Sequence, residues 1–149
     1  MPLTLSIVTA DRTVLERDDV TRLIVPGAEG QFTILPSHAA LMSSLGFGEM
    51  IAHTSNGTED IAIHGGFIQV ANDTVSVLAD AAEHADDINE ERAEEARQRA
   101  ESRVAGRSED VSEDQVDLLR AQLAIQRSLL RLKVRQRHSS RSGAPSARP

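Results

Sequence analysis

Alternation of apolar and polar residues, interrupted by turn residues about every 8 to 12 positions, is the feature that most restricts the fold of residues 1–84. Leu3, Leu5 and Ile7 alternate with polar neighbours, which is the period-2 pattern of a strand with one buried face. Most of the other apolar segments end at Gly, Pro, Asn or Asp. The further segments expected as strands are 20–25, 31–35, 49–53, 58–63, 67–70 and 75–78. This part of the chain therefore predicts an all-β sandwich or barrel.

The following part of the chain has a helical pattern instead. Asp87 and Glu90 have the spacing of a capping box, and they introduce residues 89–104, which are rich in Ala, Glu and Arg. A second helix is expected over residues 113–137. The two segments predict a helical hairpin that follows the β domain.

The second expected helix is more apolar than the first. The capping pair Ser112 and Gln115 introduces it, and its leucines form two adjacent stripes, whereas the first helix offers mainly alanine. Each leucine left exposed forgoes about 1.5 to 3 kcal/mol of burial, so a further partner is expected. Residues 138–149 lack apolar periodicity and are expected to be disordered. The predicted organisation is a β domain over 1–84, a helical domain over 85–137 and a tail over 138–149.

Composition argues against most enzyme classes. The 149 residues include no cysteine, and the five histidines lack the spacing of a metal site. There is no P-loop and no Gly-x-Ser-x-Gly nucleophile motif, so a stand-alone hydrolase is disfavoured. We therefore predict no catalytic residues and no metal-binding residues.

Charge is distributed unevenly along the chain. Residues 118–149 contain eight basic residues and no acidic residue, although the net charge of the whole chain is −7. This segment predicts an acidic partner. An alternative is a small regulatory nucleic-acid-binding protein that uses the basic helix and tail. The acidic residues of 1–117 would repel a phosphate backbone, and the three aromatic residues are too few for base stacking, so we expect no nucleic acid.

Three segments together resemble one known family. Residues 27–41 read GAEGQFTILPSHAAL, residues 65–70 read GGFIQV and residues 88–93 read INEERA. In this order they are similar to the epsilon subunit of bacterial F-type ATP synthase. The resemblance extends from residue 3 to about residue 137.

The resemblance implies a ten-stranded β-sandwich followed by two antiparallel helices. It implies a non-catalytic rotor subunit of the central stalk, whose sandwich binds the gamma subunit and the c-ring and couples proton-driven rotation to ATP synthesis. It also implies that the helical domain can inhibit ATP hydrolysis by contact with gamma and the alpha and beta catalytic subunits. The expected location is the cytoplasmic face of the cell membrane, with membrane contact only through the complex.

The interface with gamma and the c-ring is expected in the first motif, because an apolar run bounded by glycine and proline is unusual on a free edge. Ordinary core packing is the alternative for Ile34 and Leu35. Gln31 replaces an acidic residue that the family often has there, so an ionic contact is left to Glu29. The expected interface residues are Glu29, Gln31, Ile34, Leu35, Pro36, Ser37 and His38.

Two further sites are implied by the resemblance. Some family members bind ATP at the start of the first helix, and the matching residues are Ile88, Asn89, Arg92 and Ala93. Asn89 stands where those members have Asp, so no cofactor is required and regulatory ATP is an open alternative, as is simple pairing of Arg92 with nearby glutamates. The inhibitory helix would use the cations Arg127, Arg131, Lys133, Arg135 and Arg137.

Overall fold

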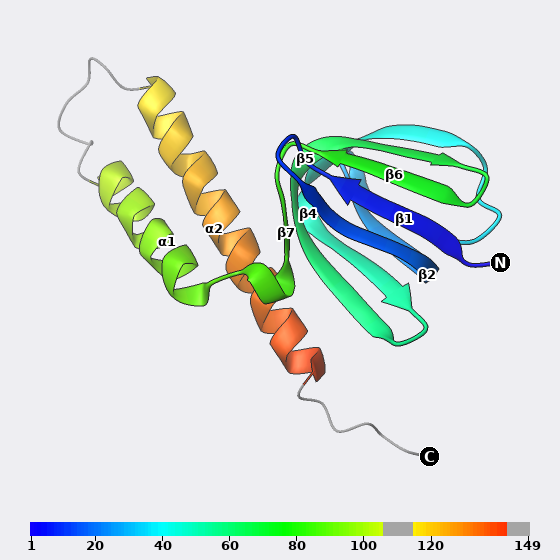
Figure 1. Cartoon of the computed structure of the whole chain (residues 1–149). Coiled ribbons are helices and arrows are strands. Elements are labelled where there is room, and N and C mark those ends of the chain that lie inside the picture. Colours follow the sequence, from blue (N-terminus) through cyan, green and yellow to red (C-terminus); the bar gives the residue numbers. More distant parts are fainter. Residues whose placement is uncertain (106–114, 143–149) are drawn as a thin grey trace. The chain divides into compact units, whose positions relative to one another are not determined.

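A computed structural model describes residues 1–105 and 115–142 of the chain (Figure 1). The chain divides into two compact units, Met1–Asp87 and Ile88–Pro149. The first unit consists of strands and one short 3-10 helix, and the described part of the second consists of two helices.

Seven strands form the first unit within the described residues, and five of them make a closed ring. The ring follows the order β1, β6, β5, β4, β2, and β2 pairs again with β1. All neighbouring pairs are antiparallel except β1 and β6, which are parallel. β3 pairs with β2, and β7 pairs with β5. The strands are β1 (Leu3–Val8), β2 (Thr13–Gly27), β3 (Gly30–Ile34), β4 (Leu41–Thr54), β5 (Gly57–Ala71), β6 (Thr74–Ala79) and β7 (Ala82–His84), followed by the 3-10 helix η1 (Ala85–Asp87).

The β-sheet class agrees with the prediction, but the expected count of ten strands is wrong. β2, β4 and β5 are 14 or 15 residues long, and each contributes to more than one pairing. β5 pairs with β4 along its length, with β7 through Ile61–Ile63 and with β6 through Gly66–Ala71. Segments that the turn residues separate in the sequence are therefore continuous strands in the fold.

The pair Gly65–Gly66 shows why β5 continues where a strand end was expected. Both residues have positive φ angles, +82° and +123°, which bend the strand. A Cβ atom on Gly66 would lie 2.2 Å from the carbonyl oxygen of Leu78 on β6. The glycines therefore allow a close approach of two paired strands instead of ending one of them.

The core of the first unit follows the period-2 pattern. Leu3, Leu5 and Ile7 of β1 are fully buried, and β6 alternates in the same way. The largest buried side chains come from β1, β2, β4 and β5 of the ring and from β3: Leu3, Leu5, Ile7, Leu23, Ile34, Met50, Ile61, Ile63 and Ile68. The sequence pattern predicted this inward face for Leu3, Leu5 and Ile7.

The second unit contains α1 (Glu90–Ala105) and α2 (Gln115–Ser142). The two helices contact each other and run antiparallel, since Glu90 at the start of α1 lies 3.8 Å from Arg135 near the end of α2. The cap of α1 is Asn89, whose Oδ1 accepts a hydrogen bond from the backbone N–H of Arg92 at 3.0 Å. The predicted capping box at Asp87 is wrong, because Asp87 belongs to η1.

The C-terminal end of α2 also differs from the prediction. The helix continues through His138 to Ser142, where disorder was expected, and Ser140 Oγ donates a hydrogen bond to the carbonyl of Gln136 at 2.9 Å. A helix once formed adds one backbone hydrogen bond for each residue, so polar residues can extend it without an apolar face. Ser112 and residues 143–149 lie outside the described residues.

The predicted excess of apolar surface on α2 is present in the structure. Leu118, Leu119 and Leu129 are exposed, whereas α1 buries the small residues Ala93 and Ala100.

Candidate interaction surface

The turn between β2 and β3 carries the first expected interface residues. Ala28 and Glu29 form the tip, and Glu29 and Gln31 are both exposed. The backbone N–H of Ala28 donates a hydrogen bond to the carbonyl of Ser44 on β4 at 3.0 Å, which fixes the turn on the sheet. A carboxylate and an amide are therefore both exposed to solvent at a turn that is held on the sheet.

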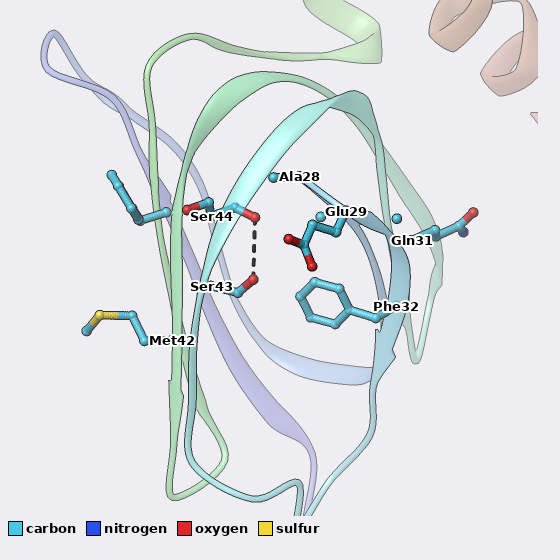
Figure 2. Close-up of a pocket in the computed structure, with 10 residues that line it drawn as sticks. Ala28, Glu29, Gln31, Phe32, Met42, Ser43 and Ser44 are labelled. Carbon is cyan, nitrogen blue, oxygen red and sulfur yellow. Dashed lines mark hydrogen bonds between the residues drawn. The ribbon is translucent and has the colours of Figure 1, made fainter.

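A pocket of about 630 Å³ lies beside this turn. In Figure 2, Ala28, Glu29, Gln31 and Phe32 form one side, and Met42, Ser43 and Ser44 of β4 lie opposite. Phe67 of β5 also lines the pocket. The pocket combines apolar side chains with hydroxyl groups and one carboxylate, which suits a protein segment with an apolar and a basic residue.

The sequence did not decide whether Ile34 and Leu35 belong to the core or to the interface, and the structure places the two residues differently. Leu35 is 51% exposed, and Ile34 is fully buried in the core. Ile34 was expected at the interface, and this is corrected: the alternation of β3 turns it inward, so it cannot contact a partner directly. Pro36 and His38 are half-buried and Ser37 is exposed, so these three remain candidates together with Leu35.

Sequence reasoning missed a group of exposed apolar residues on the strands. Phe67 on β5 lies directly opposite Leu78 on β6, and these side chains are 58% and 63% exposed. Met42 on β4 is 71% exposed, and Phe47 on the same strand is also exposed. Adjacent apolar residues such as Phe67 and Ile68 were the available signal, because one member of such a pair must point outward from a strand. Exposed apolar side chains that lie next to one another, as Phe67 and Leu78 do, are typical of a contact surface.

Asp19 forms a bidentate ion pair with Arg17 on the β unit. Among the described residues, it is the only carboxyl group whose pKa is strongly shifted. Arg17 Nε and Nη2 lie 2.9 and 2.7 Å from the two oxygens of Asp19, and Ser55 Oγ donates to Asp19 at 2.8 Å. These hydrogen bonds, from Arg17 first and then from Ser55, lower the pKa of Asp19 from 3.8 to about 2. Arg17 also lies 3.6 Å from Glu59, which is hydrogen-bonded to His84. The group links β2, β5 and β7 and has a structural role.

The expected nucleotide residues occupy the start of α1. Asn89 and Arg92 are exposed, and Ile88 and Ala93 are buried. Asn89 Oδ1 already serves as the helix cap, although a carbonyl oxygen can accept a second hydrogen bond. A pocket of about 480 Å³ nearby on the helices is lined by Glu90, Glu91, Glu94, Glu95, Gln98, Leu132 and Gln136. Its negative charge disfavours a phosphate group there.

The expected inhibitory cations all lie on α2. Lys133 and Arg137 are exposed, and Arg127, Arg131 and Arg135 are half-buried. Arg135 Nε lies 3.8 Å from Glu90 Oε1 of α1, a distance at which an exposed pair contributes at most about 1 kcal/mol. This one ion pair therefore adds little to the contact between α1 and α2.

Metal-binding clusters and membrane-spanning helices are both absent from the described ranges, 1–105 and 115–142. None of the His, Asp and Glu side chains there form a group of three or more that could hold a metal ion. Within the same ranges, neither helix is long and apolar enough to cross a membrane.

Two family models match consecutive parts of the chain. The model described as ATP synthase, Delta/Epsilon chain, beta-sandwich domain matches residues 2–85. The model described as ATP synthase, Delta/Epsilon chain, long alpha-helix domain matches residues 86–136. Together they cover nearly all of the chain that the resemblance included.

Relatives and solved structures agree with these matches. The ATP synthase epsilon chain of Nitratidesulfovibrio vulgaris (strain DP4) is 42% identical over 133 residues, which is 89% of this chain and 95% of that protein. The ATP synthase epsilon chain of Herpetosiphon aurantiacus is 42% identical over 135 residues, covering 90% of this chain and 94% of that protein. A chain in the structure of the Euglena gracilis mitochondrial ATP synthase, OSCP/F1/c-ring, shares the fold, with a TM-score of 0.71, 18% identity and coverage of 93% of this chain and 81% of that chain.

The matches confirm the resemblance, and they confirm the prediction of a non-catalytic subunit of a larger enzyme over a stand-alone hydrolase. The chain belongs to the ATP synthase delta/epsilon chain family.

Proposed function

We propose that this chain is a rotor subunit of the central stalk of a proton-translocating ATP synthase, at the cytoplasmic face of the cell membrane. Its β unit binds the gamma subunit and the c-ring and so couples rotation to ATP synthesis, and it meets the membrane only through the complex. The consecutive match of both family models, in order on one chain, is the observation that carries this proposal. A structural relative is titled as central stalk and c-ring of the Tetrahymena thermophila mitochondrial ATP synthase, which is consistent with it.

The loop around Leu35 is the proposed contact with gamma. Leu35 projects from a loop whose preceding residue, Ile34, is anchored in the core. Such an arrangement supports an apolar side chain on a rigid base, which is typical of anchor residues at protein interfaces. Glu29 supplies a charge on the neighbouring turn for the contact with the c-ring.

Assembly tests this function directly. Replacing Ser37 and His38 together with alanine should weaken binding of the full chain to purified gamma in a titration, with the domain still folded by circular dichroism. A pull-down from native membranes with the natural chain should recover gamma and the catalytic subunits. Recovery of nucleic acid alone, or unchanged gamma binding by the double variant, would count against the proposal.

The helical unit is proposed as a brake on ATP hydrolysis. The exposed leucines of α2, with its exposed Lys133 and Arg137, offer an apolar and basic surface to gamma and to acidic segments of the catalytic subunits.

Regulatory ATP at Asn89 and Arg92 is a further part of the proposal, and its support is the exposure of both side chains.

A further inference from the structure

The loop between β3 and β4 contains a residue in a strained backbone conformation. Ser37 has a φ angle of +66°, which is uncommon for a residue other than glycine. Its backbone N–H donates a hydrogen bond to Oδ1 of Asp73 at 2.6 Å, across 36 positions of sequence. This contact to a carboxylate is short, as is typical of a charge-assisted hydrogen bond.

Asp73 belongs to the tight turn between β5 and β6. Asn72 and Asp73 have φ angles of +50° and +58°, the pattern of a two-residue hairpin turn with both central residues in the left-handed region. The carbonyl oxygen of Asp73 also accepts a hydrogen bond from the backbone N–H of Thr4 at 2.8 Å. One residue therefore connects the start of β1, the β5–β6 turn and the loop after β3, and these lie at the same end of the sheet in Figure 1.

The loop has internal contacts that depend on this conformation. The backbone N–H of His38 donates to the carbonyl of Leu35 at 3.1 Å, and His38 Nδ1 lies 2.7 Å from the carbonyl oxygen of Ala39. Leu35 is the exposed residue at the start of this closed turn. The backbone of Leu35 is thus held on one side by buried Ile34 and on the other by the turn that Ser37 completes.

We infer that Asp73 is a positioning residue, which holds the Leu35–His38 loop in its binding conformation for the gamma subunit. The inference rests on the proposed function of that loop. A loop that is already ordered loses less conformational entropy when it binds, so its affinity is higher than that of the same loop when mobile. Strained residues that persist only because their surroundings hold them are typical of such sites.

Two substitutions at position 73 separate the hydrogen bond from the turn. Glycine and asparagine both tolerate positive φ, so Asp73→Gly and Asp73→Asn both keep the β5–β6 turn. Only asparagine keeps an oxygen that can accept the hydrogen bond from Ser37. Ser37→Pro also removes the N–H, but it fixes φ near −65° and therefore disrupts the Leu35–His38 turn as well, while leaving the β5–β6 turn unchanged.

The experiment measures the binding of each full-length variant to purified gamma, with Ser37 amide hydrogen exchange followed by NMR. In the Asp73→Gly variant we expect the amide hydrogen of Ser37 to exchange faster. We expect the variant to bind gamma about fivefold more weakly, which is the effect of losing one hydrogen bond. Asp73→Asn should bind within about twofold of the natural chain. Ser37→Pro, in which the whole loop turn is disrupted, should lose at least as much affinity as Asp73→Gly, and thermal unfolding establishes that each variant is folded at the titration temperature.

Leu35→Glu distinguishes failure of this inference from failure of the proposed interface. If Leu35→Glu loses gamma binding while Asp73→Gly and Ser37→Pro bind as the natural chain does, the interface stands and the positioning role of Asp73 is overturned. If Asp73→Asn loses as much affinity as Asp73→Gly, the hydrogen bond is not the cause and the inference also fails. Unchanged binding by Leu35→Glu would show that the loop does not contact gamma, and the positioning role of Asp73 would then be rejected as well.

Discussion

At the scale of single residues, neighbours that are distant in sequence change what a side chain does. Asp19 is paired with Arg17 on its own strand, but Ser55 of another turn completes its hydrogen bonds. Asn89 depends only on a local contact, because the backbone N–H that it caps belongs to Arg92, three positions away. The sequence could therefore indicate a helix start near Asn89, whereas the environment of Asp19 needed the fold.

The lowered pKa of Asp19 predicts an acid-sensitive contribution to stability. Because the folded pKa of about 2 lies below the unfolded value of 3.8, the contribution is present in full above the unfolded value and is lost as the pH falls through about 2. Asp19→Asn should therefore lower the free energy of unfolding at neutral pH, and its difference from the natural chain should shrink over that acid range. Urea unfolding at a series of pH values measures this. Asp11→Asn, at an exposed turn position, is the matched control for the loss of one charge.

Asn89 and Arg92 provide the residue-scale test of ATP binding. If the two side chains bind ATP, Asn89→Asp should tighten binding through a charge-assisted hydrogen bond, and Arg92→Ala should abolish it. Aspartate caps a helix as well as asparagine does, so the start of α1 is preserved in the first variant. Isothermal calorimetry on the full chain decides, and no heat from millimolar ATP with either the natural chain or the Asn89→Asp variant would reject the site.

At the scale of strands and helices, the number of apolar segments in the sequence does not give the number of strands, because long strands such as β5 span more than one segment. The sequence places turn residues at Gly65 and Gly66, and a strand end there is the natural prediction. The fold uses the same two residues to bend β5 and to bring it close to β6. A turn residue indicates a permitted backbone conformation, and pairing with a neighbour decides whether the strand stops.

Gly66→Ala should destabilise the β unit through contact with β6. The added Cβ would lie 2.2 Å from the Leu78 carbonyl oxygen, and the φ angle of +123° adds strain. We expect a loss of about 2 kcal/mol or more in the free energy of unfolding. Gly57→Ala is the matched control, since Gly57 has a φ angle of +148° but open space around its Cβ position. Equal losses for the two variants in urea unfolding would show that backbone strain alone is responsible.

At the scale of the whole molecule, the chain combines a β unit with a closed ring of strands and a helical unit with exposed leucines and basic residues. Each exposed leucine leaves apolar area in water, so burial of α2 against a partner is favourable. In the proposed function, the β unit serves assembly and the helical unit serves regulation.

Removal of the α2 surface should therefore affect hydrolysis without affecting assembly. Deleting residues 106–149, or neutralising Arg127, Arg131, Lys133, Arg135 and Arg137 together, should raise ATP hydrolysis by the reconstituted complex and leave proton-driven synthesis largely intact. The five positions are changed together because one exposed ion pair contributes at most about 1 kcal/mol. The assay belongs at low ionic strength, where screening is weakest. Hydrolysis rates equal to those of the natural complex would show that α2 is not the brake.

Sequence alone determined the β class of the first part, its inward face at Leu3, Leu5 and Ile7, the two helices and the family. These features depend on short-range geometry, because side-chain direction repeats every two residues in a strand and about every 3.6 in a helix. Only the tertiary structure decided that five strands close into a ring, that Ile34 is buried while Leu35 is exposed, and that Asp73 holds Ser37. The physical reason is that strand register and contacts across 36 positions depend on how the whole core packs, and no local pattern encodes which distant residue becomes the neighbour.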